Sequence, residues 1–402
     1  MNAFLFPLAF VSPALFLSAL LGLKESREHP VLKSLALGLC AAVAFYGMRC
    51  DSSTDIYRHI ALLPAYNTSF LGCFDAGHYG GLYVWDIWCW IIEKTGDPYL
   101  LQCSAAFVGY SIIAYICIDY SCRYERGQAG WVAPFLFAVC AVPVFPLVAG
   151  IRSTMAVLIC ALSFYLHSQK EMPLVIAALL DVCAIMIHQV AIFPLIFLLV
   201  LPLARKGATK AIVTCFVTFL FIAAIGQLIL PYLPSDNGVL SFLRKALESL
   251  LRYDAGNSWT EANRNSLNGI ANRISTISLI LVVVTLSMKY LKKDEGNKAL
   301  FGLGLYTCLI SVASMALIIV LPVNGERFLP TAFALGAPFI SDLSSANKKH
   351  GDRAPFVAAS VVAILSLAAL ALHVYSLVYG LEDPSGLVLT CLFGAIGATF
   401  GL

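Results

Sequence analysis

The sequence predicts an all-α, polytopic membrane protein with a single integral membrane domain over residues 1–402. Hydrophobic residues make up 60% of the chain and charged residues only 12%, a balance that no soluble globular domain can bury. Apolar runs of about 20 residues, the length that crosses a bilayer as a helix, recur from the third residue to the last. Lipid is therefore the solvent of this chain, and helices satisfy the backbone within it.

Taking each apolar run as a span gives about thirteen transmembrane helices, with a range of roughly 12 to 14. Six short loops between alternate spans hold 16 of the 26 lysine and arginine residues. Basic loops stay in the cytoplasm, so the N-terminus is expected outside and the C-terminus in the cytoplasm. The expected spans are residues 3–23, 34–48, 99–118, 131–149, 153–168, 174–188, 190–204, 211–230, 271–290, 299–321, 328–342, 355–379 and 386–402.

One apolar stretch breaks the alternation of loops. Residues 83–94 are too short for a full span, carry Asp86 and Glu93 on one helical face, and hold three tryptophans. A crossing here would move every later basic loop outside, so we expect a short re-entrant or interfacial helix within an outer-face segment of residues 49–98. A second outer loop, residues 231–270, has leucines at helical spacing and is expected to contain an amphipathic helix.

The first polar cluster of the outer face is MRCDSSTDIYRHI, residues 48–60. Its two aspartates are four residues apart, so a helical turn points both carboxylates the same way. Such a pair can hold a cation, act as a base toward a sugar hydroxyl or pair with arginines. The structural alternative is an interfacial polar turn that ends a helix. The candidate residues of this cluster are Arg49, Asp51, Asp55, Tyr57 and Arg58.

An arginine interrupts the apolar run PVFPLVAGIRSTMAVLICALSFYL, residues 143–166. The run is too long for one span and suits two short ones. A guanidinium at bilayer depth costs about 2.5–3.5 kcal/mol on insertion scales, so it is rarely accidental. A bend at Gly150 would place Arg152 at the outer mouth of a cavity, where it can bind a phosphate through two hydrogen bonds. The structural alternative is an arginine that snorkels to the interface or pairs with a buried aspartate.

Two further polar turns fall on the same side of the membrane. IMIHQVAIFP places His188 and Gln189 between two short spans, and Asp181, seven residues earlier on the same helical face, can orient the imidazole. A lone histidine in an apolar setting is more often structural. PVNGERFLP presents Glu326 and Arg327 at the start of a late span, where a charge pair can simply end a helix.

Arg49, Arg152 and Arg327 are the exceptions in outer loops with few positive charges. Three arginines that converge on one cavity suit a pyrophosphate, because its charge calls for several cations. The chain has no Walker loop, GxSxG or HExxH motif. Its basic residues are spread among short loops rather than gathered on a nucleic-acid surface. No metal, cofactor or nucleic-acid partner is expected.

The order of these motifs resembles the EpsG-like branch of the Wzy-type bacterial polysaccharide polymerases. The resemblance rests on a D(x3)D(x)YR element after an early span, GxR opening a short span, HQxA opening a later one, and an arginine before a late span. It is clearest over residues 48–200. The early acidic element of the family falls on Asp51, Asp55 and Tyr57, and its GxR arginine falls on Arg152. Its HxS-type histidine falls on His188, and its late arginine falls on Arg327.

Two positions depart from the family pattern. Val190 stands where a serine often follows the histidine by two places, and FDAGHYGGLY stands where a glutamate is often found. We expect three catalytic residues, three pyrophosphate-binding arginines and six further substrate-binding residues. These groups are, in turn, Asp51, Asp55 and His188; Arg49, Arg152 and Arg327; and Tyr57, Arg58, Asp75, His78, Gln189 and Glu326.

The resemblance implies a membrane glycosyltransferase, loosely of the GT-C class, that joins oligosaccharide repeat units carried on undecaprenyl pyrophosphate. Such an enzyme works at the outer face of the bacterial inner (plasma) membrane. The implied partners are the lipid-linked donor and acceptor, the bilayer, and the chain-length regulator and flippase of the same pathway. The arginines would stabilise the departing pyrophosphate, while Asp51, Asp55 or His188 would serve as the base or position the acceptor hydroxyl.

A transporter or flippase for a lipid-linked or anionic solute is the alternative from another class. It also needs buried charges that face a cavity and about twelve helices, and Asp181 is the residue that favours it. Transport requires access from both sides, however, whereas the unusual polar residues gather on the outer side. A membrane O-acyltransferase would also use histidine and arginine, but its site is expected toward a cytoplasmic acyl donor.

Overall fold

The computed structural model describes most of the chain, and helices dominate it. The expected spans 3–23 and 386–402 and the amphipathic helix of residues 231–270 lie largely outside the described residues, as do Asp51 and His78. The described residues are 12–13, 29–50, 52, 54–77, 81–125, 129–142, 150–232, 244, 248, 266–293, 297–320, 325–341, 343, 354–379, 381–383 and 391–392.

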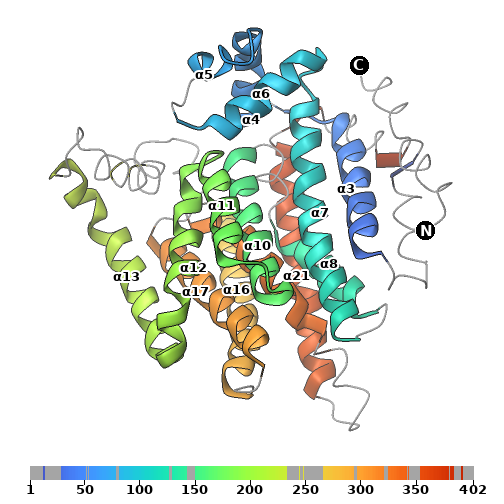
Figure 1. Ribbon diagram of the computed structural model, residues 1–402. Coiled ribbons are helices and arrows are strands. Elements are labelled where there is room, and N and C mark those ends of the chain that lie inside the picture. The colour runs from blue at the N-terminus through green and yellow to red at the C-terminus, as the bar shows by residue number, and fades with distance from the viewer. Residues whose placement is uncertain are drawn as a thin grey trace.

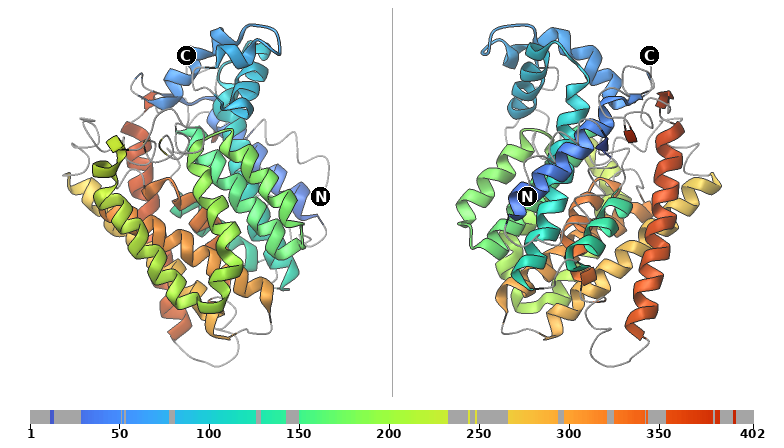
Figure 2. Two further views of the ribbon diagram at one scale, coloured as in Figure 1. Left: turned by 60° about the vertical axis from the view of Figure 1, so that its left-hand side comes forward. Right: turned by 90° about the vertical axis from the view of Figure 1, so that its right-hand side faces the viewer.

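The all-α prediction is confirmed, and the helices of the bundle follow the predicted spans (Figures 1 and 2). Within the described ranges, six helical segments are long and apolar enough to cross a membrane, and four shorter apolar helices accompany them. The bundle helices are α3 (Pro30–Tyr46), α7 (Leu100–Arg123), α8 (Ala129–Ala141), α10 (Ile151–Lys170), α11 (Leu174–Ile185), α12 (Ile192–Ala204), α13 (Ala208–Ile229), α16 (Leu267–Lys293), α17 (Lys298–Val320), α19 (Leu329–Gly336) and α21 (Ala354–Tyr379).

The longest apolar segment, Gln189–Gly226, has 38 residues. At 1.5 Å per residue a straight helix of that length would measure about 57 Å, far more than the ~30 Å hydrocarbon core. The short 3-10 helix η4 (Arg205–Gly207) divides it into α12 and α13, which meet at the lower end of the bundle in Figure 1. This segment therefore folds as two helices, over the residues where the sequence predicts two spans.

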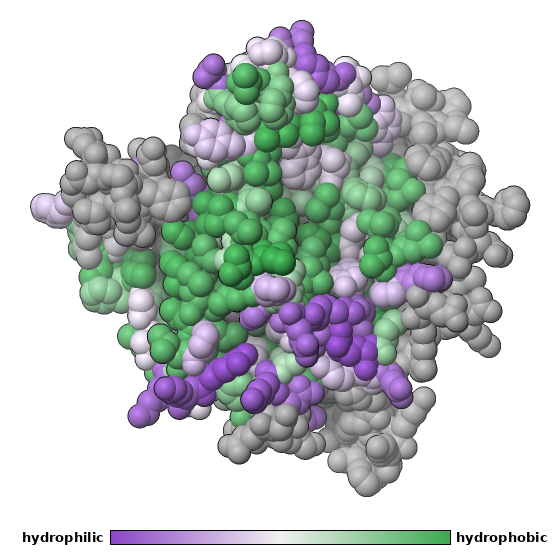
Figure 3. Space-filling view, in the orientation of Figure 1, coloured by the Kyte–Doolittle hydropathy of each residue, from purple (hydrophilic) through white to green (hydrophobic). Residues whose placement is uncertain are grey.

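The surface of the bundle is apolar around its middle. Figure 3 shows hydrophobic side chains over this band, with hydrophilic residues gathered below it and at the top. Large apolar side chains stay exposed along α11, α12, α13 and α21. Such a band marks the surface that faces lipid in a multi-pass membrane protein.

Close helix packing fills the interior. Gly38 lets α3 approach α7, because a Cβ at this position would overlap Ser111 and the backbone oxygen of Phe107. Phe164 of α10 stacks on Tyr306 of α17 with ring centroids 3.7 Å apart. Small residues and stacked rings of this kind hold helices together in lipid, where burial from water gives little driving force. The bundle thus provides a rigid frame for the polar residues at its ends.

Four short elements sit together at the upper end of the bundle (Figure 1). We call them the cap: α4 (Asp55–Leu62), η2 (Leu63–Tyr66), α5 (Cys73–Ala76) and α6 (Tyr83–Thr95). The helix α6 coincides with the apolar stretch that the sequence sets apart as a short helix, and it ends where Gly96 adopts the left-handed conformation with φ of 75°. The cap belongs to the segment between α3 and α7 that the sequence places on the outer face.

A small antiparallel sheet joins two distant parts of the chain at the same end. The strand β1 (Arg49–Cys50) follows α3, and β2 (Leu381–Asp383) follows α21. Arg49 lies opposite Asp383 in the register. The pairing was not predicted, because neither segment has an apolar alternation long enough to indicate a strand.

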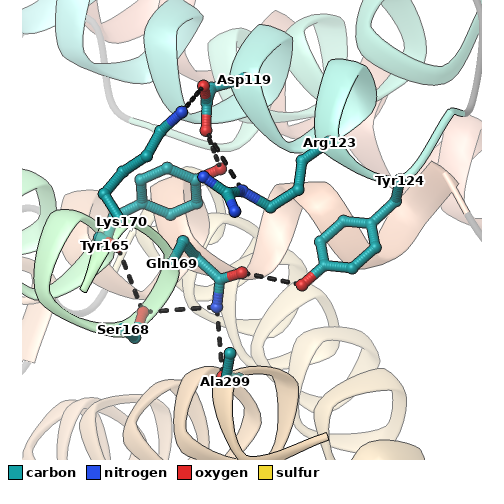
Figure 4. Close-up of polar contacts among 8 residues, drawn as sticks. All are labelled: Asp119, Arg123, Tyr124, Tyr165, Ser168, Gln169, Lys170 and Ala299. Atoms are coloured by element: carbon teal, nitrogen blue, oxygen red, sulfur yellow. Dashed lines mark hydrogen bonds and ion pairs between the residues drawn. The ribbon is translucent and has the colours of Figure 1, made fainter.

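A buried carboxylate links the last turns of α7 and α10 (Figure 4), at the end of the bundle away from the cap (Figure 1). Asp119 accepts a hydrogen bond of 2.9 Å from the Tyr165 hydroxyl and pairs with the Lys170 ammonium at 2.6 Å. The neighbouring Gln169 donates to the backbone oxygen of Ala299 at 3.1 Å, which adds α17 to the network. These contacts fasten three helices to one another.

Asp119→Asn should lower the thermal midpoint Tm of the detergent-solubilised protein. Removal of one partner from a buried ion pair costs up to about 3–5 kcal/mol, but Lys170 is about one-third exposed and water screens it. We therefore expect a loss of about 1–2 kcal/mol in unfolding free energy. Heating with detection of the remaining monodisperse protein measures it. Arg123→Gln is the control, because its Nε lies 3.9 Å from Asp119; an equal loss in both variants would contradict the assignment.

Candidate functional site

Arg152 lies at the upper end of the bundle, in the first turn of α10. Gly150 precedes the helix with a non-helical backbone (φ −96°, ψ 46°), so the break that the sequence predicts at this glycine is confirmed. The N-terminus of a helix carries a partial positive charge. A cation in the first turn is therefore poorly placed for helix stability, whereas both the cation and the helix end favour a bound anion.

The cap reaches Arg152 through a tryptophan. Trp85, in the first turn of α6, is 1% exposed, and its ring centroid lies 5.7 Å from the Arg152 guanidinium carbon. The His59 ring of α4 packs against Trp85 at 5.0 Å between centroids. The backbone N–H of Trp85 donates to the Met186 oxygen at 3.3 Å, at the end of α11. The cap, α10 and the end of α11 thus meet at this residue.

His188 lies in the turn between α11 and the short 3-10 helix η3 (Gln189–Ala191). Its Nδ1 accepts a hydrogen bond of 3.1 Å from the Val190 backbone N–H and so caps η3. A backbone N–H can only donate, so Nδ1 must be unprotonated and the proton of the neutral ring sits on Nε2. His188 therefore presents Nε2–H as a hydrogen-bond donor.

The charges around His188 show which residues share this region. Burial is the largest cause that holds the pKa of His188 well below its usual value. The positive charges of Arg327 and then of Arg152 lower this pKa further. The same two causes, burial and the charge of Arg152, lower the pKa of His59 to about 3. Both imidazoles are neutral at neutral pH, and the two arginines supply the positive charge. We call Arg152, His188 and Arg327 the cation cluster.

Tight packing places Arg327 at this end of the bundle. A Cβ on Gly325 would lie 2.5 Å from the backbone nitrogen of Ile318, so the turn before α19 runs directly against α17. The next residue after the arginine, Phe328, is buried against Phe193 of α12 with ring centroids 5.8 Å apart. These contacts fix the start of α19 beside the start of α12, where η3 and His188 also lie.

Asp86 is the carboxylate nearest to this region on α6. Its Oδ1 accepts a hydrogen bond of 2.9 Å from the Tyr66 hydroxyl, and Gly77 lies so close that a Cβ there would be 2.6 Å from Oδ2. Burial raises the pKa of Asp86, while the hydrogen bond from Tyr66 and the charge of Arg152 lower it. The Asp86 carboxyl group of the cap thus lies within electrostatic range of Arg152.

The other residues predicted for the site lie in several places. Asp55 and Arg58 form an ion pair on the surface of α4, and Tyr57 beside them is 48% exposed. Arg49 donates to the backbone oxygen of Tyr46 at 3.0 Å and stacks on a tyrosine ring at 3.7 Å. Asp75 lies on α5 of the cap, Gln189 opens η3, and Glu326 precedes Arg327.

The structure therefore places Arg152 and Arg327 within electrostatic range of His188, and it adds residues that the sequence analysis did not assign to the site. These are His59, Trp85 and Asp86. His59 directly follows Arg58 in the predicted outer cluster, and this position in the sequence was the signal that could have assigned it to the site. No signal in the sequence indicates that Trp85 docks against Arg152. In the described ranges, no group of three or more His, Cys, Asp and Glu side chains can hold a metal ion.

The lowered pKa of His59 predicts how stability depends on pH. The unfolded chain takes up a proton on this histidine below its ordinary pKa of 6.5, whereas the folded protein resists protonation down to about 3. The free energy of unfolding should therefore fall as the pH drops from about 6.5 toward 4. Thermal melts across this range test the effect. His59→Phe keeps an aromatic contact with Trp85 and should reduce the slope of the dependence; an unchanged slope would contradict the account.

The comparison with protein families decides which family holds this site. The family model described as the EpsG family matches residues 34–380. The chain belongs to the EpsG family. The match includes the cap and the whole cation cluster of this EpsG-family protein, and membership points to a membrane polysaccharide polymerase. Searches among curated proteins and among solved structures each gave no match.

Proposed function

We propose that this EpsG-family protein is a glycosyltransferase that polymerises oligosaccharide repeat units carried on undecaprenyl pyrophosphate. The observation that carries the proposal is the cation cluster. Arg152, His188 and Arg327 come from three separate segments and lie at one end of the bundle beside the cap. Two guanidinium groups and one imidazole N–H form a site suited to a pyrophosphate.

The main requirement of the reaction is stabilisation of the negative charge that develops on the leaving pyrophosphate. The bond between C1 of the donor sugar and its pyrophosphate oxygen breaks, and the acceptor hydroxyl oxygen forms the new bond to C1. The hydroxyl proton passes to a base, and undecaprenyl pyrophosphate leaves with the negative charge. Groups that hold this charge more tightly as it develops lower the barrier.

The residues divide between the two halves of this reaction. Arg152 and Arg327 bind the leaving pyrophosphate, and His188 donates its Nε2–H to one of the phosphate oxygens. Asp51 and Asp55 are the proposed bases, and the exposed face of α4 with Tyr57 and Arg58 is the proposed surface for the acceptor sugar. The roles of Asp75, His78, Gln189 and Glu326 in binding the oligosaccharide belong to the same proposal.

The proposed face of the membrane is the outer one. The cap and the cation cluster share one end of the bundle, and the basic loops that include Lys170, Lys206 and Lys298 lie at the other. Basic loops remain in the cytoplasm, which supports an outer-face site in the bacterial inner membrane. Lipid-linked repeat units flipped to that face would be the donor and acceptor, and the flippase and chain-length regulator would be partners.

A transporter remains the second candidate because of one residue inside the bundle. Asp181 on α11 is 0% exposed, and its carboxyl group lies inside the bundle beside the side chains of Cys160 and Ser163 of α10. Buried carboxyl groups of this kind serve proton coupling in transporters. Against this candidate, the network around Asp119 fastens the lower ends of three helices, where a transporter has to open.

The deciding experiment uses purified protein in detergent micelles. The substrate is one undecaprenyl-pyrophosphate-linked repeat unit of the host's own polysaccharide. A micelle has no second compartment, so transport leaves the substrate unchanged, whereas a polymerase yields a ladder spaced by one repeat unit. We expect the ladder. A folded, monodisperse preparation that forms none from the cognate substrate would contradict the proposed function.

A further inference from the structure

We infer that Trp85 of the cap is a positioning residue that holds the Arg152 guanidinium ready to bind pyrophosphate. The inference rests on the proposed function, and it gives the cap a direct part in the site. It assigns to α6 a role beyond that of a short helix at the membrane surface.

Arg152 lies among positive charges, so a neighbouring group that attracts its guanidinium stabilises it there. It lies at the positive end of α10, and it shares the region around His188 with the like charge of Arg327. An aromatic ring attracts the cation through its π face and consumes no donor, and tryptophan does so most strongly.

The geometry meets this requirement. The guanidinium carbon lies 5.7 Å from the Trp85 ring centroid, inside the ~6 Å range of a cation–π contact. The indole is held in place on its other contacts, because it is buried and the His59 ring packs against it. A support that is itself fixed can hold a flexible arginine in one orientation.

The same residue also connects Arg152 to the histidine of the cluster. The backbone N–H of Trp85 bonds to the oxygen of Met186, two residues before His188. One residue of the cap therefore contacts Arg152 through its ring and, through its backbone, the segment that leads to His188. Substitution of the side chain leaves the backbone bond in place, so the contribution of the ring can be measured separately.

The chain offers a matched control on the same helix. Trp88 lies one turn further along α6, and its indole N–H donates to the Ser104 hydroxyl of α7 at 2.9 Å. Trp88→Phe removes that hydrogen bond and keeps a ring. It therefore weakens a contact between the cap and α7 without removing the ring beside Arg152.

The test measures donor kcat and KM in the ladder assay for wild type, Trp85→Phe, Trp85→Leu and Trp88→Phe. A cation–π contact contributes about 0.5–2 kcal/mol, equivalent to about 3–30-fold. We expect Trp85→Leu to raise the donor KM and to lower kcat/KM within that range, and Trp85→Phe to lose about threefold. Trp88→Phe should keep the wild-type KM, because partial misfolding lowers the active fraction and leaves KM unchanged.

A binding titration with undecaprenyl pyrophosphate tests whether the effect passes through Arg152. Trp85→Leu should weaken binding in the wild-type background and have no further effect in Arg152→Ala. Unchanged KM and unchanged binding in Trp85→Leu, with a ladder from wild type, would overturn the inference. Additive losses would do the same. If Trp85→Leu does not fold, Trp85→Phe decides by the same criteria. A wild type that forms no ladder contradicts the proposed function instead.

Discussion

Arg152→Ala should reduce polymerisation by about 10²–10³-fold in kcat/KM, the cost of removing one group that stabilises a developing anion in a preorganised site. Arg152 is at the positive end of α10 and within electrostatic range of His188. The folded state should survive, because removal of a cation from the N-terminal turn of a helix relieves an unfavourable interaction with its dipole. The ladder assay and a thermal melt, run together, measure both effects.

Arg152→Lys separates charge from geometry. Lysine keeps the positive charge but lacks the planar fork that binds two oxygens at once, so we expect it to recover only a small part of the activity. Arg123→Gln is the control, since this arginine lies at the opposite end of the bundle beside Asp119. Full activity in Arg152→Lys would mean that charge alone matters, and full activity in Arg152→Ala would remove Arg152 from the site.

His188→Asn and His188→Gln should differ in activity, and their order identifies the role of the imidazole. Asparagine places its oxygen near the position of Nδ1 and can keep the hydrogen bond from Val190, but it has no donor at the position of Nε2. Glutamine has the opposite properties. If His188 donates Nε2–H to the pyrophosphate, Gln should retain about tenfold more activity than Asn, equivalent to about 1.4 kcal/mol for one hydrogen bond to a charged group.

The Tm values of the same pair provide the control. The His188→Asn variant should melt close to wild type because it preserves the hydrogen bond that caps η3. The His188→Gln variant should lose about 0.5–2 kcal/mol of unfolding free energy. Activity that follows stability, with Asn above Gln, would show that His188 acts only as a cap. A polymerisation rate with an acid limb near pH 6.5 would also contradict a neutral donor, because the pKa of His188 lies well below that value.

Much of the site was predictable from the sequence. Counting the apolar spans is enough to tell at which end of the bundle each polar residue lies. The length of each apolar run and the position of basic loops assign Arg152, His188 and Arg327 to one end. The helix break at Gly150 was predictable for the same reason, since residues 143–166 are too long for one span. None of these inferences requires knowledge of how the helices pack.

The contacts among the cap residues were not predictable, because they depend on how a short segment docks on the bundle. The tryptophans of α6 look alike in sequence, but only Trp85 packs beside Arg152, whereas Trp88 bonds to Ser104. Arg49 was expected to join the other arginines. Its described contacts are instead with the backbone after α3 and with the Tyr99 ring, because β1 pairs with a strand more than 300 residues away.

The most direct test of the account is whether the cation cluster binds pyrophosphate. The measurement is a titration of purified protein with undecaprenyl pyrophosphate and, separately, with undecaprenyl monophosphate. We predict tighter binding of the pyrophosphate by wild type, and loss of that preference in Arg152→Ala and in Arg327→Ala, because each guanidinium contributes charge to the second phosphate. Equal binding of the two lipids by wild type, or an unchanged preference in both variants, would contradict the central claim.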